Sequence, residues 1–322
     1  METKRIGTNA NAIFKTEYPN PTWIVPNLIP SGMTLLAGRP KAGKSWIALQ
    51  IAREVSSGGE MFGEKMEQGK VLYLALEDNN HRLKKRMITQ QWGEKSRKNT
   101  DFITFKTFSE KIGFLHLGMK EGDSKAGANA RKLYKEVEDG KYKVVIIDTF
   151  SNAFLGLKNI DDNQIITLVM KPLQEISLAN NIGTIVLDHH NKMSEQAPNL
   201  INDVMGSTAK VSISDTIIGM YRKGKDQRRI LATGKDIEDM DMMVRKDRYC
   251  VWQRDDILPG LTFKDQELFE LLVNNKVSRL SVLSEALQEA EPNVSTRLLK
   301  LRKMGYADKT KDGFVAVIQV AL

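Results

Sequence analysis

Residues 35–48 of this chain read LLAGRPKAGKSWIA. They contain one complete G-x-x-x-x-G-K-S motif, which lies between an apolar run at residues 33–37 and an amphipathic run at residues 46–55. A strand, a glycine loop and a helix in this order predict a phosphate-binding loop (P-loop), whose backbone N–H groups turn towards the phosphates of a nucleotide. The N-terminus of the helix adds a partial positive charge there. The loop consists of Gly38, Arg39, Pro40, Lys41, Ala42, Gly43, Lys44 and Ser45, and Trp46 follows it.

Two side chains of this loop have expected roles in holding ATP. Lys44 can reach the β- and γ-phosphates, and the Ser45 hydroxyl can hold Mg²⁺. The alternative is a surface turn that carries Gly-Lys-Ser by chance, and the flanking runs argue against it. The motif therefore predicts ATP and Mg²⁺ as the bound cofactors.

Composition limits the class of protein. The chain has 322 residues, of which 41% are hydrophobic and 27% charged, as in soluble globular proteins. Its longest apolar runs fall short of the ~20 residues that cross a bilayer, and residues 1–15 lack the apolar core of a secretory signal. Cys250 is the only cysteine, which fits a reducing compartment. We expect a cytoplasmic protein without a membrane partner, and its net charge of +8 is compatible with a nucleic-acid partner.

Three further apolar runs, at residues 71–76, 144–147 and 184–187, each end in polar residues. Helical patterns at residues 80–92, 126–137 and 162–180 alternate with them, and residues 101–108 suggest one more short strand. This alternation predicts an α/β fold with a mainly parallel sheet, in which ligands bind outside the carboxyl ends of the strands.

The polar residues at these strand ends are candidates for catalysis. Asp148 follows four aliphatic residues, a Walker B pattern that orients Mg²⁺, although a capping aspartate is an alternative. Glu77 could orient the attacking water, and its neighbour Asp78 could be confused with it. The alternative is that Glu77 only stabilises the N-terminus of the following helix. Of His189 and His190, strand alternation would point only one towards the site.

No zinc site is expected from the remaining histidines. His81, His116 and Cys250 form no cluster of ligands with the strand-end histidines. The basic helix that contains Arg82 and Arg86 is interpreted as a solvated face rather than a DNA site.

Outside the predicted sheet, residues 1–22 are polar and are expected to form a flexible N-terminal segment. Trp23 is expected to pack in the core, with stacking on the adenine as an alternative. Residues 216–221, 229–233 and 249–253 are expected to extend the sheet in antiparallel fashion, and residues 255–260 to form a linker.

Residues 261–322 are expected to form a separate winged helix-turn-helix domain. Helical patterns at residues 264–273, 278–289 and 292–304 precede a hairpin pattern at residues 305–318, and Ser278 or Ser281 could cap the second helix. The third helix carries Arg297, Lys300 and Arg302, so it could read duplex DNA in the major groove. The domain's near-neutral balance leaves a protein-docking role equally open.

The segments GRPKAGKS, LALED, VVIIDT and LDHHNK, in this order, resemble the RecA-like ATPases. The resemblance covers roughly residues 22–255 and is closest to the plasmid and phage branch of RepA-type replicative helicases. It implies a RecA-like core with an inserted strand between the P-loop and Walker B strands. It also implies a homo-oligomer, hexameric in that branch, with nucleotide between subunits and single-stranded DNA in a central channel.

The resemblance also implies roles for individual residues. Glu77 is the expected catalytic carboxylate, Asp148 the acid on the Mg²⁺ side, and His189 or His190 the sensor of the γ-phosphate. Relatives often supply a cation from the neighbouring subunit, for which Lys235 is our preferred candidate. The full set of candidates is Arg222, Lys223, Lys225, Arg228, Arg229 and Lys235.

Two loops, at residues 154–161 and 191–206, are expected to face the channel, where Lys192 and Lys210 could contact a phosphate backbone. The sequence thus predicts an ATP-dependent DNA motor, a replicative helicase of a plasmid or phage. The alternatives are a recombination or loading ATPase that does not unwind DNA, and a nucleotide-gated regulator that binds DNA through the winged helix.

Overall fold

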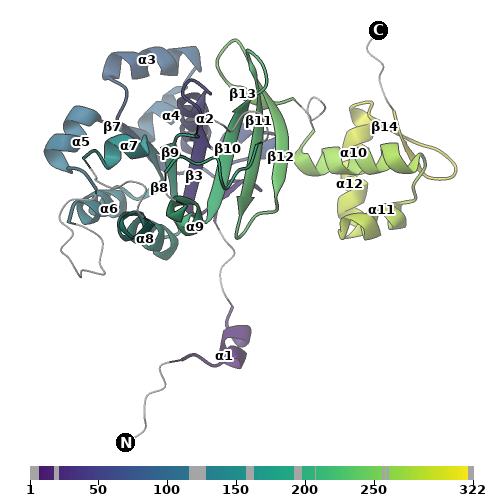
Figure 1. Ribbon diagram of the computed structural model, residues 1–322. Helices are drawn as coiled ribbons and strands as arrows, with labels where there is room; N and C mark the ends of the chain where they lie inside the picture. The colour runs from purple at the N-terminus through teal and green to yellow at the C-terminus, as the bar shows by residue number, and fades with distance from the viewer. Residues whose placement is uncertain are drawn as a thin grey trace, which may run out of the picture.

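The computed structural model describes residues 7–17, 22–115, 128–156, 163–191, 198–206, 208–255, 258 and 261–317. Its main body is built on a nine-stranded sheet with the order β13-β12-β11-β10-β3-β9-β8-β6-β7 (Figure 1). The strands are β3 (Gly32–Gly38), β6 (Lys70–Ala75), β7 (Thr100–Thr104), β8 (Tyr142–Asp148), β9 (Gly183–Asp188), β10 (Thr216–Arg222), β11 (Gln227–Gly234), β12 (Met240–Lys246) and β13 (Trp252–Arg254).

The strands from β10 to β7 in this order are all parallel, and β11, β12 and β13 continue the sheet in antiparallel fashion. Every residue of β3 and β9 is buried, as expected for strands covered on both faces. β9 lies between the P-loop strand β3 and the Walker B strand β8. The strand before Glu77, which comes between the P-loop and Walker B strands in the sequence and was expected as the intervening strand, is β6, and it lies instead on the far side of β8.

Helices cover both faces of the sheet and create two apolar cores. One core contains side chains of α2 (Lys44–Ser57) and α3 (Asn80–Thr89), and the other contains side chains of α6 (Ala128–Gly140) and α8 (Asn163–Ala179). The shorter helices are α4 (Glu94–Lys98), α5 (Phe105–Lys111), α7 (Phe150–Ala153) and α9 (Ala209–Ile213). In the described part of the chain, no helix is long and apolar enough to cross a membrane.

Two short hairpins accompany the sheet: β1 (Trp23–Val25) pairs with β2 (Ile29–Pro30), and β4 (Glu60–Met61) with β5 (Glu64–Lys65). Before them, α1 (Ala10–Lys15) stands apart from the body and has no buried residue (Figure 1). Its first turn is capped by the Asn9 side chain, which accepts a hydrogen bond from the Asn11 N–H. The expected flexible segment 1–22 therefore includes a short helix, because asparagine is a strong N-cap.

The C-terminal part contains three helices and a hairpin around a core of its own. They are α10 (Phe263–Asn275), α11 (Leu280–Leu287), α12 (Glu291–Lys303), β14 (Ala307–Lys309) and β15 (Phe314–Ala316). Leu268, Leu272, Leu283, Leu298 and Leu301 form the centre of this core. The element order agrees with the sequence prediction, and most of the predicted linker lies outside the described residues.

Several boundaries differ from the sequence predictions. β10 is parallel to β3 rather than antiparallel, because the connection from β9 returns through α9, which packs on α8, before the chain enters the strand. Residues 105–108 belong to α5 instead of a strand, and β12 was not predicted at all. The N-cap of α11 is Arg279 without a side-chain hydrogen bond, so neither Ser278 nor Ser281 caps it.

Candidate nucleotide-binding site

The carboxyl ends of the neighbouring strands β3, β9, β8 and β6 meet at one cavity of about 440 Å³, which we call the nucleotide cavity. Residues 40–46 of the P-loop line it. The other lining residues are Glu77, Arg86, Asp148, Thr149, His189, Arg228, Lys246 and Trp252. Most of the side chains predicted from the sequence are therefore brought together, whereas Arg39, His190 and Lys235 do not line this cavity.

Two glycines of the P-loop permit close approaches that a side chain would block. Gly43, the N-cap of α2, has a φ of +109°, and a Cβ there would lie 2.5 Å from Cζ2 of Trp252. A Cβ on Gly38 would lie 3.0 Å from the carbonyl oxygen of Met220. The motif needs glycine at both positions because the loop is packed against β10 and β13 as well as around phosphates.

The Lys44 ammonium is held at the base of the loop. Its Nζ donates hydrogen bonds to the carbonyl oxygens of Gly38 at 2.6 Å and Arg39 at 3.2 Å. Burial lowers the pKa of Lys44, while the carboxylates of Asp148, Asp188 and Glu77 act in the opposite direction. A cation in this position can turn towards phosphate oxygens without leaving the loop.

Asp148 has the features of a ligand for a hard cation. It is 3% exposed, and its Oδ2 accepts a hydrogen bond of 2.8 Å from the Tyr73 hydroxyl. Its Oδ1 has no hydrogen-bond partner among the described residues. Burial raises the pKa of Asp148 to about 6, and hydrogen bonds from Tyr73 and Ser45 oppose this shift. A buried, unused carboxylate oxygen beside the Ser45 hydroxyl fits Mg²⁺, which prefers oxygen ligands.

The structure gives different surroundings to Glu77, the expected catalytic carboxylate, and to its neighbour Asp78. Asp78 is buried and forms ion pairs with Arg82, at 2.9 Å, and with Arg86. Glu77 is exposed, lines the cavity and accepts a hydrogen bond of 3.0 Å from the Thr149 hydroxyl. Glu77 is thus the carboxylate that can reach a water molecule in the cavity.

The two histidines after β9 have different surroundings. His189 lines the nucleotide cavity, and burial lowers its pKa. His190 is 5% exposed, packs on the Tyr221 ring with a centroid separation of 4.8 Å, and faces a neighbouring cavity. Burial, followed by the charges of Lys44 and Arg39, lowers the pKa of His190 to about 4. The expectation that only one histidine points into the site agrees with this geometry.

Sequence reasoning missed the wall contributed by the last strands of the sheet. Arg228 is 3% exposed, and its Nε donates a 2.6 Å hydrogen bond to the Ala42 carbonyl, so it supports its own P-loop. Its guanidinium also lies 5.3 Å from the ring centroid of Trp252. Because these contacts hold Arg228 within its own subunit, the prediction that it could act on the nucleotide of a neighbouring subunit is corrected.

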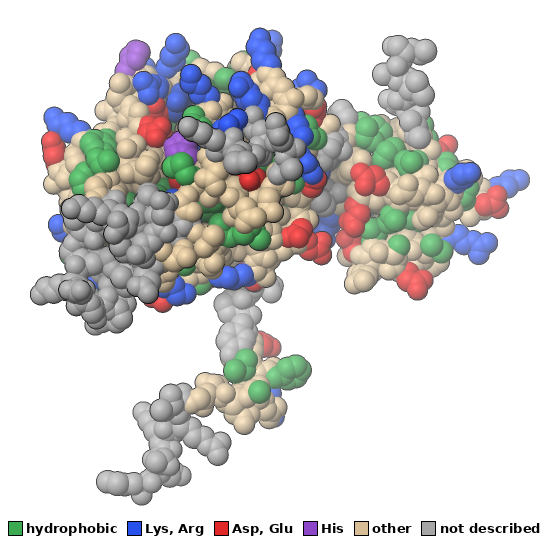
Figure 2. All heavy atoms as spheres, viewed as in Figure 1, with side chains coloured by type: hydrophobic (Ala, Val, Ile, Leu, Met, Phe, Trp, Pro, Cys, Tyr) green, Lys and Arg blue, Asp and Glu red, His purple; other side chains and the backbone are tan. Residues whose placement is uncertain are grey.

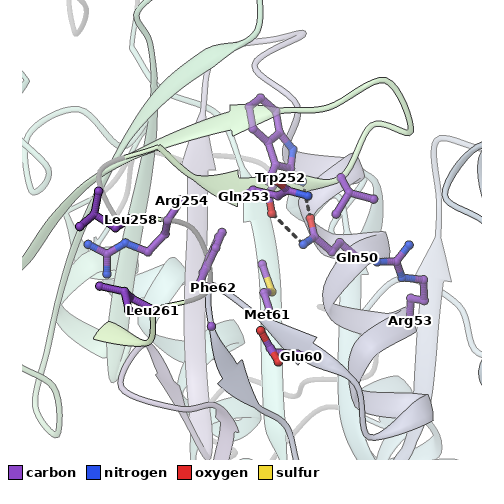
Figure 3. A pocket seen from close by; sticks show the side chains of 12 residues that line it. Gln50, Arg53, Glu60, Met61, Phe62, Trp252, Gln253, Arg254, Leu258 and Leu261 are labelled. Atoms are coloured by element: carbon purple, nitrogen blue, oxygen red, sulfur yellow. Dashed lines mark hydrogen bonds between the residues drawn. The ribbon is translucent and has the colours of Figure 1, made fainter. Parts of the chain in front are cut away.

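Trp252 is anchored to the P-loop helix through its main chain. Figure 3 shows the two hydrogen bonds: Trp252 N–H donates to Gln50 Oε1 at 2.7 Å, and Gln50 Nε2 donates to the Trp252 carbonyl at 2.9 Å. Behind this link lies a further cavity of about 330 Å³, which includes Phe62 and Leu261 (Figure 3). Trp252 therefore separates the nucleotide cavity from the start of the C-terminal part.

Arg86 is the third missed residue. It lines the nucleotide cavity, and its guanidinium lies 5.4 Å from the ring centroid of Trp46. The interpretation of the Arg82–Arg86 helix as a solvated face is therefore wrong for Arg86, whereas Lys84 and Lys85 are exposed as expected. The sequence of α3 alone gives no signal that one of its basic residues contacts a side chain on another helix.

The structure places three further residues away from the positions that their predicted roles require. Lys210 is 1% exposed and forms an ion pair of 2.8 Å with Asp188, so it does not face a channel. Trp23 lines a different cavity, and its neighbour Ile24 packs on Gly183 at the start of β9, far from an adenine site at the strand ends. Lys235 pairs with Asp215 at 2.8 Å beside the amino end of β10, at the sheet edge opposite the P-loop. Lys192 lies outside the described residues.

Comparison with known proteins identifies a family and two similar structures. None of the curated proteins matches the sequence. The structure is similar to a KaiC-like protein from the hyperthermophilic archaeon Pyrococcus horikoshii, with 17% identity, a TM-score of 0.47, and coverage of 70% of this chain and 90% of that one. It is also similar to the ATPase domain of G40P, with 15% identity, a TM-score of 0.49, and coverage of 69% and 84%. The AAA domain family AAA_25 matches residues 2–195, more than half of the sequence, and the chain belongs to this family.

Proposed function

We propose that this protein is an ATPase that acts as a DNA motor, and specifically a replicative helicase of the plasmid and phage RepA-type branch. The observation that carries the ATPase assignment is the arrangement of Lys44, Asp148 and Glu77 around one cavity. The first is anchored under the P-loop, the second has an unused buried oxygen, and the third is a carboxylate held only by Thr149 within the described residues.

Each of these residues has one step in the proposed reaction. Lys44 binds the β- and γ-phosphates, and Ser45 and Asp148 would hold Mg²⁺, whose charge offsets that on the phosphoryl oxygens. Glu77 orients a water molecule in line with the γ-phosphate and accepts its proton. His189, which also lines the cavity, would detect whether the γ-phosphate is present.

A basic edge supports the choice of DNA as partner. Figure 2 shows Lys and Arg side chains gathered over α3 and the ends of β10 and β11. The exposed members of this edge are Arg82, Lys84, Lys85, Arg222, Lys223 and Lys225. They lie at the carboxyl ends of the parallel strands, where the nucleotide cavity is also found, so that nucleotide and polyanion would meet on one edge.

In the proposed assembly, identical subunits form a hexamer with single-stranded DNA in the central channel. A cation of the β10–β11 turn, such as the exposed Lys225, is better placed than Lys235 to approach the nucleotide of a neighbour, because Lys235 is paired at the opposite ends of the strands. Hydrolysis would then open and close subunit interfaces and move the loops that leave β8 and β9.

The C-terminal part is proposed to be a winged-helix domain that docks on protein. Three cations of α12 form ion pairs within the domain: Arg297 with Glu289 at 2.8 Å, Lys300 with Asp265, and Arg302 with Asp308 at 3.9 Å. A recognition helix for duplex DNA needs such side chains at its surface. This observation disfavours the regulator that would read an operator.

The test compares ATP hydrolysis and strand displacement, with and without single-stranded DNA, for the parent, Glu77→Gln and the control Glu94→Gln. Glu94 is an exposed carboxylate on α4 whose removal should leave both activities within about twofold. We expect DNA-stimulated hydrolysis and unwinding in the parent and the control, and neither in Glu77→Gln. Stimulated hydrolysis without unwinding would favour the loading ATPase. Sequence-specific duplex binding without hydrolysis would favour the regulator.

A further inference from the structure

A second cavity, of about 570 Å³, shares residues 40–42 of the P-loop and His189 with the nucleotide cavity, whereas its other walls are different. We call it the back cavity. Arg39, Lys41 and Arg222 line it, and none of its lining residues in the described part of the chain is a carboxylate. A lining that contains three basic side chains and no acid among the described residues favours an anion as ligand.

His190 supplies a second, independent sign of a ligand. It lines the back cavity and is 5% exposed, yet neither Nδ1 nor Nε2 has a hydrogen-bond partner within the described residues. Buried polar groups are nearly always paired, so an imidazole without a partner that faces a cavity indicates a group that arrives with a ligand. A neutral imidazole offers one N–H donor and one acceptor.

The rest of the lining is apolar and suits a base. Met205 is 43% exposed, Met220 is buried, and the His190 ring lies against Tyr221. Methionine side chains adapt to flat rings, and stacking and sulfur contacts are tolerant of base identity. The cavity thus combines cations for a phosphate with an apolar wall for the group that the phosphate carries.

We propose that the back cavity holds one nucleotide unit of a single nucleic-acid strand, with its phosphodiester against Arg39, Lys41 and Arg222 and its base beside Met205. The proposal rests on the proposed function, since it names where the strand of that motor is held. The phosphates of ATP and of the strand then lie against the same short turn, residues 40–42. Binding of one can therefore alter the geometry that the other meets.

Met205 is the residue to change, because substitutions there can place a negative or a positive charge in the back cavity without altering the P-loop. Its main-chain contacts, with the His189 carbonyl at 2.9 Å and the Lys210 ammonium at 3.0 Å, do not depend on its side chain. Ile201, 53% exposed on the same segment, lines a different cavity and gives a matched control. Thermal unfolding of each variant checks that the fold is intact.

The measurement is the affinity of the full-length protein for labelled oligothymidylate over a series of salt concentrations, with a non-hydrolysable ATP analogue present. Met205→Glu should weaken binding by about tenfold and make the salt dependence shallower by about one unit of slope. Met205→Lys should tighten binding, whereas the control Ile201→Glu should stay within about twofold. Equal losses in Met205→Glu and Ile201→Glu, or no change in either charged Met205 variant, would overturn the proposal.

The stoichiometry of the ATP analogue, measured by calorimetry without DNA, distinguishes a strand from a free nucleotide. We expect one analogue per chain in the parent and in Met205→Glu. Two per chain, with one lost in Met205→Glu, would make the back cavity a second nucleotide site and overturn the strand assignment. A parent that binds no oligothymidylate at any salt would refute the DNA motor itself. A parent that binds it while Met205→Glu is unaffected would refute the back cavity alone.

Discussion

Replacing Lys210 with methionine should lower the free energy of unfolding by about 3–5 kcal/mol. Lys210 and Asp188 are 1% and 2% exposed in their side chains, and their charged atoms are 2.8 Å apart. The Lys210 ammonium also lies 4.2 Å from the Phe150 ring centroid. Methionine keeps most of the volume but leaves the Asp188 carboxylate buried without its cation. The cost comes from that unpaired charge rather than from lost packing.

Equilibrium unfolding in urea at neutral pH measures this change. The double variant Lys210→Met/Asp188→Asn should recover most of the loss, because it removes the charge that was left alone. Lys84→Met, on the exposed face of α3, should change stability by less than about 0.5 kcal/mol. If Lys210→Met unfolds like the parent and instead binds single-stranded DNA more weakly, the buried ion pair is wrong and the channel-facing role predicted from the sequence is right.

Three further outcomes are expected. Gly43→Ala should reduce ATP affinity by more than about tenfold in a fluorescence titration, because φ is +109° and the new Cβ meets Trp252; unchanged affinity would contradict the loop geometry. Gln50→Leu should cost about 2 kcal/mol in urea unfolding by removing two hydrogen bonds to Trp252, and a cost near zero would mean that the link is not formed. Burial lowers the pKa of His190 to about 4, below the unfolded value near 6.5, so stability is complete above pH 6.5 and should fall by about 3 kcal/mol towards pH 4. His190→Phe should flatten that slope, and an equal slope in both proteins would place its origin elsewhere.

The part of the site that follows the parallel strands could be predicted from the sequence because its signals are local. Asp148 and Glu77 each come directly after a buried apolar run, and strand ends of a parallel sheet meet at one edge. The distinction between Glu77 and Asp78 depends on how α3 is oriented in the fold, because this orientation brings both Arg82 and Arg86 to Asp78 and leaves Glu77 in the cavity.

The residues that form the opposite wall of the nucleotide cavity could not be predicted from the sequence. β12 reads MDMMVRK, in which the half-exposed Met243 lies between the buried Met242 and Val244, so apolar and polar residues do not alternate and the strand was not predicted. Arg228 looked like a surface cation in a charged turn, but its partner is the Ala42 carbonyl. Lys210 misled for the same reason: only the fold brings Asp188 to it, and a lysine is almost never buried without such a partner.

The contact between Gly43 and Trp252 has a consequence for how the protein is made. The two residues stand at opposite ends of the ATPase part of the sequence, and Arg228 joins the same loop from the same late region. During synthesis the P-loop leaves the ribosome early, long before the strand that packs against it. The nascent chain can therefore acquire its nucleotide pocket only after β13 has emerged, so ATP could stabilise the finished domain but not its early folding intermediates.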